Sequence, residues 1–177
     1  MFNLENHKTA IKNGLIWGGI SIATILVLYL FGMIENVAGN ILLFLFGLYM
    51  MYQSGVSKRN DLGGYISWKQ SLTPIWLTSI ISSLLSIPFT WIMYKFIDPG
   101  LQERQKEEAV KMIERMRGWL GDAATEAELE KLETQDFASP GQYVLVFFGA
   151  IFFYFLISCI IGLIVKRKDQ SEIFTKY

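Results

Sequence analysis

The amino-acid sequence predicts an all-α membrane protein, a bundle of four transmembrane helices with an amphipathic helical insertion between the third and the fourth. Two observations predict this class. The chain contains four long apolar stretches without a charged residue: Leu15–Ile34, Val37–Val56, Pro74–Tyr94 and Tyr143–Val165. Each has about the 20 residues that a helix needs to cross the roughly 30 Å hydrocarbon core. None alternates with the period of two of a β-strand, and only helices and closed barrels satisfy their backbone polar groups in lipid.

Length and composition predict a single integral membrane domain over residues 1–177. Of these residues, 52% are hydrophobic and 18% are charged, as expected when about half of a chain lies in lipid. The only cysteine, Cys159, lies in the fourth apolar stretch, and the only histidine, His7, lies in the polar leader. These counts exclude an intrachain disulfide, and they predict neither a metal site nor a cofactor.

The first two spans are expected at about residues 14–34 and 37–56, and the short turn between them predicts an antiparallel hairpin. Small residues four positions apart mark places where membrane helices can approach closely. Such pairs occur in the first and the fourth span: Gly14 and Gly18, and Ser158 and Gly162. They fit either packing within the bundle or a homodimer interface, and packing within the bundle is the favoured interpretation.

The segment before the third span contains the most distinctive string, Gly63-Gly64-Tyr65-Ile66-Ser67-Trp68-Lys69-Gln70-Ser71-Leu72. A serine followed three residues later by glutamine is a capping box, so a helix is expected to begin at Ser67. Tyr65 and Trp68 carry the amphipathic rings that anchor a chain at the membrane–water interface, and we predict that role for both.

The third span is expected at about residues 74–97. Pro88 has no backbone N–H to donate, so it should kink this helix. Neighbouring serine hydroxyls could satisfy the freed carbonyls, which makes the bend either structural or part of a permeation path. A structural bend is the favoured interpretation. Asp98 precedes Pro99. A proline disfavours the helical conformation of the residue before it, so the span should end at Asp98.

The polar segment at about residues 99–140 is expected to contain two helices. Oppositely charged residues recur at a spacing of four in its first part, and one face of that helix is apolar. Gly118 and Gly121 should break this helix, and the capping box formed by Thr125 and Glu128 should start the second. Both helices are too polar to insert, so we expect them to lie on the membrane surface, to cap the bundle or to bind a partner.

The fourth span, at about residues 142–165, leads to a basic cluster at Lys166–Lys168. The leader and the segment before the third span are basic as well, whereas the insertion carries six basic against eleven acidic residues counted from Asp98. Basic residues favour the cytoplasmic side, and an even number of spans places both termini on one side. We therefore expect a multi-pass protein of the bacterial inner membrane with cytoplasmic termini and an extracytoplasmic insertion.

Four short motifs resemble one bacterial family. Besides the string from Gly63 to Leu72, they are the Asn13-Gly14-Leu15-Ile16-Trp17-Gly18 opening, the Phe96-Ile97-Asp98-Pro99 end of the third span and the Lys166-Arg167-Lys168 exit. With these motifs the chain resembles, over almost its whole length, the family catalogued as domain of unknown function 4199. The resemblance implies a four-span inner-membrane protein without an established activity, and it transfers no catalytic or binding residues.

The distribution of ionisable residues weakens two classes of function. None lies inside an apolar stretch, which argues against a proton-coupled transporter or a carrier of charged substrates. The chain also lacks the GxSxG and HExxH motifs and a phosphate-binding glycine loop. Glu35 and Asp98, both expected at extracytoplasmic span ends, come nearest to an acid–base pair, and solvated helix-end charges are their favoured interpretation.

We therefore expect a non-enzymatic accessory or scaffolding subunit of a membrane complex rather than an enzyme. Its expected partners are the lipid bilayer and either another membrane protein or a second copy of the chain, without nucleic acid. Two alternatives stay open: a small transporter or pore that uses the kinked third span, and a membrane enzyme or lipid-binding factor at the extracytoplasmic interface. A continuous polar stripe across the bundle would favour the transporter, and convergence of Glu35, Asp98 and the acidic residues of the insertion would favour the enzyme.

Labelling of single cysteines in a variant without Cys159 checks the orientation. Glu35→Cys and Glu126→Cys should react with a membrane-impermeant thiol reagent in intact cells. Lys58→Cys and Lys176→Cys should react only after permeabilisation, because the basic segments are expected in the cytoplasm. Labelling at position 58 in intact cells would contradict the predicted orientation.

Overall fold

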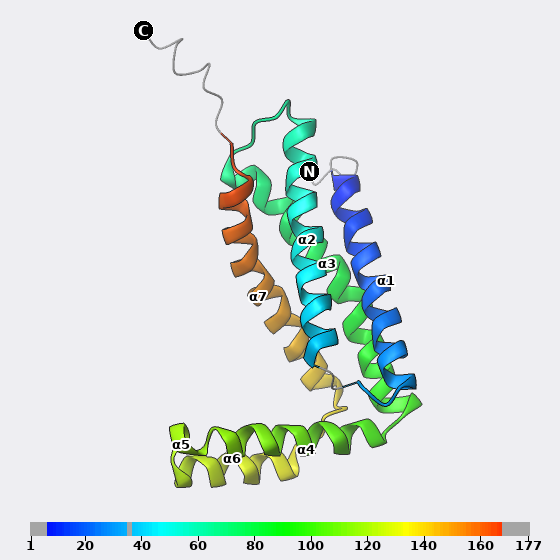
Figure 1. Ribbon diagram of the computed structural model, residues 1–177, viewed down its shortest axis with the longest axis vertical. Helices are drawn as coiled ribbons and strands as arrows, with labels where there is room; N and C mark the ends of the chain where they lie inside the picture. Colours follow the sequence, from blue (N-terminus) through cyan, green and yellow to red (C-terminus); the bar gives the residue numbers. More distant parts are fainter. Residues whose placement is uncertain (1–6, 35–36, 168–177) are drawn as a thin grey trace. The chain divides into compact units, whose positions relative to one another are not determined.

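The computed structural model describes residues 7–34 and 37–167, and this part of the chain is almost entirely helical (Figure 1). Its elements are α1 (Lys8–Leu30), α2 (Val37–Asp61), α3 (Trp68–Ile92), the π-helical turn η2 (Met93–Ile97), α4 (Gly100–Arg115), α5 (Arg117–Leu120), α6 (Asp122–Thr134) and α7 (Pro140–Val165). Four helical segments are long and apolar enough to cross a membrane: Lys8–Leu30, Val37–Asp61, Trp68–Ile97 and Pro140–Val165. The predicted all-α class with four spans is confirmed.

The first two spanning helices extend beyond the apolar stretches that predicted them. α1 begins at Lys8 rather than at residue 14, and α2 continues to Asp61 rather than ending at residue 56. Polar residues at the membrane surface continue a helix until the backbone meets a stop signal. Gly63 and Gly64, with φ of +80° and +93°, supply that signal after α2. Glu35, in the turn between α1 and α2, lies outside the described residues.

α3 begins where the capping box predicts. The side-chain oxygen of Gln70 accepts hydrogen bonds from the backbone N–H (3.0 Å) and the hydroxyl (2.8 Å) of Ser67. The backbone N–H of Gln70 donates to the Ser67 hydroxyl (3.4 Å). This cap brings the third span to 30 residues, from Trp68 to Ile97. Pro88 lies inside α3 without ending it, and the kink expected there stays a prediction.

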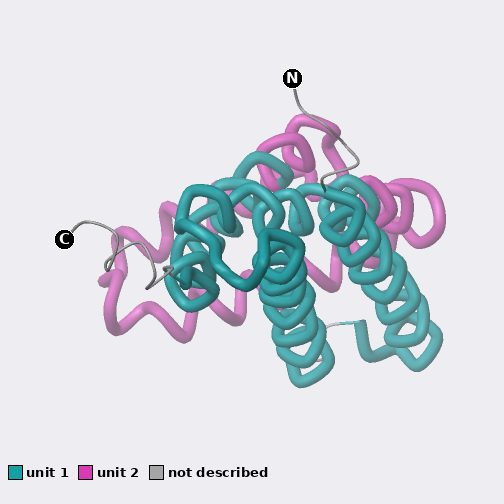
Figure 2. The backbone as a smooth tube through the Cα atoms, turned by 90° about the horizontal axis from the view of Figure 1, so that it is seen from above, with its two compact units in different colours: residues 1–87, 147–177 teal, residues 88–146 magenta. Residues whose placement is uncertain are grey.

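The chain forms two compact units (Figure 2). The first contains residues 1–87 and 147–177, and so holds α1, α2, most of α3 and most of α7. The second contains residues 88–146, with the end of the third span, the helices α4, α5 and α6, and the start of α7. Both units contain part of the third and the fourth span, because α3 and α7 each pass from one unit into the other.

In the first unit, small residues bring α1 close to α3. A Cβ atom added to Gly14 would lie 2.7 Å from the Cβ of Ile81, and one added to Gly18 would lie 2.8 Å from the Cδ1 of Leu85. Both distances are shorter than real contacts of a Cβ atom, so the backbones can approach this closely only because both residues are glycines. The face of α1 that carries Gly14 and Gly18 therefore contacts α3 of the same chain.

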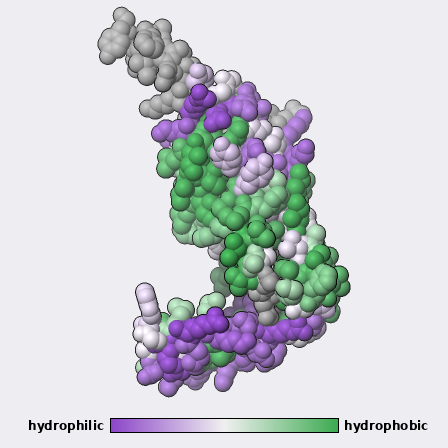
Figure 3. Space-filling view, viewed as in Figure 1, coloured by the Kyte–Doolittle hydropathy of each residue, from purple (hydrophilic) through white to green (hydrophobic). Residues whose placement is uncertain are grey.

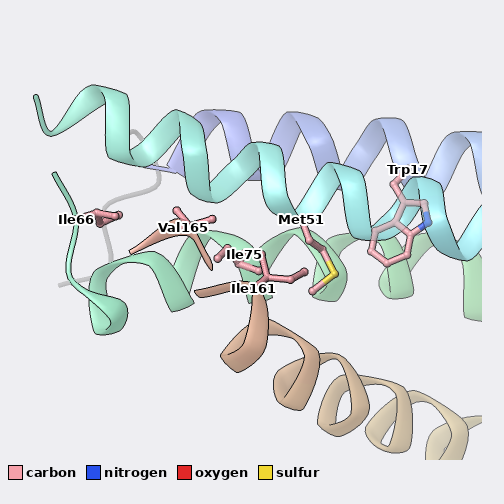
Figure 4. Close-up of a cluster of buried hydrophobic side chains, with 6 residues drawn as sticks. All are labelled: Trp17, Met51, Ile66, Ile75, Ile161 and Val165. Atoms are coloured by element: carbon pink, nitrogen blue, oxygen red, sulfur yellow. The ribbon is translucent and has the colours of Figure 1, made fainter. Parts of the chain in front are cut away.

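The apolar core of the first unit contains Trp17 together with Met51, Ile66, Ile75, Ile161 and Val165 (Figure 4). The Trp17 ring packs edge-on against Tyr154 of α7, with 5.3 Å between the ring centroids and 87° between the ring planes. On α2, the same ring lies so close to Gly47 that an added Cβ atom would overlap it. One tryptophan of α1 thus contacts two further spans.

Two further tryptophans connect α3 to α7. The indole N–H of Trp68 donates to the carbonyl of Cys159 (3.0 Å), and that of Trp76 donates to the carbonyl of Ile151 (3.1 Å). The two donors are eight residues apart on α3, and the two acceptors are eight residues apart on α7. Because the later donor bonds to the earlier acceptor, the two helices run antiparallel, and the two bonds are about two helical turns apart. Gly162 lies against the Trp68 ring, where an added Cβ atom would be 3.2 Å from the indole nitrogen.

In the second unit, α4, α5 and α6 form a helical layer whose residues are mostly hydrophilic (Figure 3). The predicted capping box at Thr125 is wrong, because α6 already begins at Asp122. The Thr125 hydroxyl instead donates to the carbonyl of Gly121 (2.9 Å). Gly121 has a φ of +79°, which ends α5 and lets α6 start at the next residue. The predicted break at Gly118 is also wrong, since that residue lies within α5.

Gly47→Ala should lower the melting temperature of the purified protein, because the added methyl group would overlap the Trp17 ring, which also packs against Tyr154. Overpacking of this kind costs about 1–3 kcal/mol. Gly19→Ala is the matched control, since a Cβ atom there meets no described atom within 4 Å and alanine favours a helix more than glycine does. Equal melting temperatures for the two variants would contradict the role of the Trp17 contact.

Candidate functional site

A polar cluster lies where α1, α2 and α3 meet in the first unit. The side-chain amide of Asn13 donates to the hydroxyl of Ser54 (2.9 Å), and the hydroxyl of Thr78 lies 2.7 Å from the same oxygen. The Thr78 hydroxyl also reaches the carbonyls of Pro74 (2.9 Å) and Ala10 (3.3 Å). Ser54 and Thr78 are buried. These polar groups therefore bond to one another and join three spans inside the bundle.

The polar cluster borders a cavity of about 420 Å³. Its lining comes from the start of α1, the end of α2 and the first turns of α3: His7, Lys8, Thr9, Ala10, Ser54, Lys58, Asp61, Leu62 and Pro74. Lys8 and Lys58 bring two cations, and Asp61 brings a carboxylate. Burial and the nearby charge of Lys58 lower the pKa of His7, so the imidazole is mainly neutral at pH 7. The cavity thus combines charged side chains with the hydroxyl groups of the cluster.

Three serines of α1 and α3 outside this cluster hydrogen-bond within their own helices. On α3, Ser79 and Ser86 donate to the carbonyls three and four residues earlier, at 2.7 Å and 3.0 Å. On α1, Ser21 donates to the carbonyl four residues earlier, at 2.8 Å. α1 and α3 lie too close together at Gly14 to admit a methyl group. The serines of α3 therefore contribute small volume to a packed contact between two spans.

The two small residues predicted to pack in the fourth span are both buried on α7. The Ser158 hydroxyl donates to the carbonyl of Tyr154 (2.6 Å), and Gly162 contacts Trp68. The indole N–H of Trp68 donates a hydrogen bond to α7. This contact was not predicted from the sequence, although Trp68 and Trp76 are eight residues apart and so lie on nearly the same face of a helix. Tyr65 is exposed. The role of Tyr65 and Trp68 as interface anchors stays a prediction.

Asp98 ends the third span and also begins the next helix. Its backbone is extended (φ −142°, ψ 89°), as the following proline predicts, and its N–H closes the π-helical turn by donating to the carbonyl of Met93 (2.9 Å). Its carboxylate accepts a hydrogen bond from the N–H of Gly100 (3.0 Å), at the first turn of α4. A carboxylate is favourable at a helix N-terminus, so the start of α4 offsets the unfavourable position at the end of the span.

Arg117 links the three helices of the second unit through ion pairs. Its guanidinium lies 2.8 Å from the carboxylate of Glu114 on α4 and 3.0 Å from that of Asp122 on α6. The hydrogen bond from Arg117 lowers the pKa of Glu114, and the two carboxylates raise the pKa of Arg117. Glu114 and Arg117 therefore stay charged over the physiological pH range, and the two ion pairs of Arg117 connect α5 to α4 and α6.

The family model described as "Protein of unknown function (DUF4199)" matches residues 12–167. The chain belongs to this family. The match covers α2 to α7 and all but the first residues of α1, so it includes both the polar cluster and the helical layer. No curated protein and no solved structure matches the chain.

Ser54→Ala should destabilise the protein, because it removes the hydroxyl that Asn13 and Thr78 share. A hydrogen bond between membrane helices contributes about 0.6 kcal/mol on average, and a shared hydroxyl should exceed that value. Ser21→Ala is the control, since the Ser21 hydroxyl donates to a carbonyl of its own helix. The measurement is the melting temperature in nanodiscs, and a smaller decrease for Ser54→Ala than for Ser21→Ala would contradict the proposed link.

Proposed function

We propose that this member of the DUF4199 family is a non-enzymatic accessory or scaffolding subunit of a complex in the bacterial inner membrane. The protein is a multi-pass membrane protein with four spans, and its family carries no assigned function. In this proposal the bundle binds another membrane protein through an outer helix face. The observation that carries it is a second small-residue face on α1, which the bundle leaves open.

α1 carries small residues on two faces. Gly14 and Gly18 face α3, as their short distances to that helix require. Gly19 and Ala23 are exposed, and a Cβ atom on Gly19 would meet no atom of the described residues within 4 Å. Leu15 and Val27, each 50% exposed, continue this outer face by one turn in either direction. Two small residues between two large ones form a notch that suits a ridge of side chains on a partner helix.

The packing of the bundle supports a role as a platform. Trp17 contacts α2 and α7, and the indole groups of Trp68 and Trp76 donate hydrogen bonds to α7. The cluster of Asn13, Ser54 and Thr78 joins three spans. Contacts of this kind fix the spans of the first unit relative to one another. A surface that is ordered before binding loses less conformational entropy when a partner binds.

Charge supports the proposed orientation, with both termini in the cytoplasm. The guanidinium of Arg59, at the end of α2, donates to the carbonyl of Val165 at the end of α7 (3.3 Å). Arg167 pairs with Ile66 through two backbone hydrogen bonds of 3.0 Å. These contacts gather basic residues of two chain segments at one end of the first unit. Basic residues favour the cytoplasmic side of the membrane.

Extraction of tagged full-length protein from native membranes into nanodiscs tests the proposed interface, with mass spectrometry of the proteins that copurify. Gly19→Ile fills the notch on α1, so it should reduce recovery of the partner severalfold without lowering the melting temperature. Gly149→Ile is the control. Gly149 is an exposed glycine of α7 whose added Cβ atom likewise meets nothing within 4 Å in the described chain.

Each outcome bears on the α1 interface. Loss of the partner with Gly19→Ile alone supports it, and a partner with the mass of this chain identifies a second copy. Equal recovery with Gly19→Ile and wild type would contradict the interface. Loss with both variants would contradict it as well, because the effect would then follow from a bulky residue on any exposed span.

A further inference from the structure

The layer of α4, α5 and α6 is attached to the membrane at both of its ends. In the second unit the third span ends at Ile97, and α4 begins at Gly100. Three residue steps reach no further than about 11 Å, so the start of α4 lies within that distance of the end of the third spanning helix. At the other end, α6 ends at Thr134 and the fourth span begins at Pro140.

α4 and α5 expose a continuous apolar stripe. It consists of Met112, Met116, Trp119 and Leu120, which are 63%, 46%, 97% and 40% exposed. Their spacing of i, i+4, i+7 and i+8 places them on one helical face. The N–H of Met116 donates to the carbonyl of Met112 (3.2 Å), and the N–H of Leu120 donates to that of Met116 (2.9 Å). α4 ends at Arg115 and α5 begins at Arg117, and these two hydrogen bonds connect the helices across Met116, so the four exposed side chains lie in consecutive turns.

This stripe lies outside the contact between α4 and α6. That contact buries Thr125 and Leu132 of α6, and the ammonium group of Lys106 donates to the carbonyl of Glu133 (3.3 Å). Trp119 is almost fully exposed, so it contributes little to holding the layer together. Neighbouring exposed apolar side chains that do not pack within the layer are typical of an interaction site.

Attachment and charge together identify the occupant as lipid. The spans on either side hold the layer at a bilayer surface, where tryptophan and other apolar side chains are favourable. Three of the six cations of the layer form ion pairs within it: Lys111 with Glu108 (2.6 Å), Arg117 with Glu114 (2.8 Å) and Lys131 with Glu128 (2.6 Å). Between Asp98 and Gln142, six basic residues stand against eleven acidic ones, so attraction to anionic headgroups does not bring the layer to the membrane.

We propose that Met112, Met116, Trp119 and Leu120 insert into the boundary between headgroups and acyl chains of the bilayer. α4 then lies along the membrane surface, with its charged face in water. Insertion is driven by the apolar side chains and not by charge, which distinguishes this layer from the basic amphipathic helices that bind anionic membranes. This inference is independent of the partner proposed for α1.

Accessibility of a nitroxide label in full-length protein without Cys159 tests the insertion, in nanodiscs of phosphatidylcholine that contain no other protein. At Met116→Cys, lipid-soluble oxygen should relax the label severalfold more than a water-soluble nickel chelate does. Glu107→Cys is the control, because nine residues are two and a half turns and place position 107 on the opposite, charged face. There the preference should be reversed.

Two results at position 116 would overturn the proposal. Access of the nickel chelate equal to that at position 107 would place the stripe in water. Shielding from both reagents would place it against protein, whether of this chain or of a second copy. Replacing part of the phosphatidylcholine by anionic phosphatidylglycerol should leave oxygen access unchanged or lower it, and a clear increase would overturn insertion driven by apolar side chains. None of these results depends on the notch at Gly19.

Discussion

The contact between Trp17 and Gly47 is the one on which the packing of the first unit depends. Helices in lipid gain little from burying apolar side chains against one another, so they associate where backbones approach closely and polar groups find partners. Because Gly47 has no side chain, the Trp17 ring lies directly on α2 and still reaches Tyr154 of α7. α1, the helix that carries Trp17, also contacts α3 closely at Gly14 and Gly18. Large and small residues are thus matched across the contacts of α1 with the other three spans.

Hydrogen bonds fix how these helices align. Trp68 and Trp76 donate two hydrogen bonds from α3 to α7, about two helical turns apart, and these bonds align the two helices. The hydroxyl of Ser54, which Asn13 and Thr78 share, joins α1, α2 and α3. An indole N–H in lipid has no water to bond with, so a helix carbonyl that can accept a second bond is its natural partner. The interior of the first unit is therefore held by specific contacts, and the features left for recognition are its outer faces and the charged cavity beside Ser54.

In the second unit, α4, α5 and α6 are mostly hydrophilic (Figure 3), and ion pairs connect them. Asp98 ends the third span, and its carboxylate accepts a hydrogen bond from the N–H of Gly100 in the first turn of α4, so the next helix begins within a few residues. Gly121 then reverses the chain, and Arg117 holds α5 to both of its neighbours. The apolar side chains that this unit buries, among them Leu101 and Leu132, do not include the exposed stripe on α4 and α5. Its exposed methionines and Trp119 are consequently available for the bilayer to which the spans attach it.

The sequence by itself determined the class, the number of spans and the elements that depend on local chemistry. Apolar length, the cap at Ser67 and the stop at Asp98 are properties of neighbouring residues, and all three could be predicted. Thr125 shows the limit of such reasoning, since the turn at Gly121 started α6 one turn earlier than its capping pattern indicated. Only the tertiary structure decided that Gly18 faces α3 while the adjacent Gly19 is exposed, and which side chains surround the cavity. The reason is physical: helical periodicity fixes the direction of each residue around its own helix, but packing with other helices decides what lies in that direction.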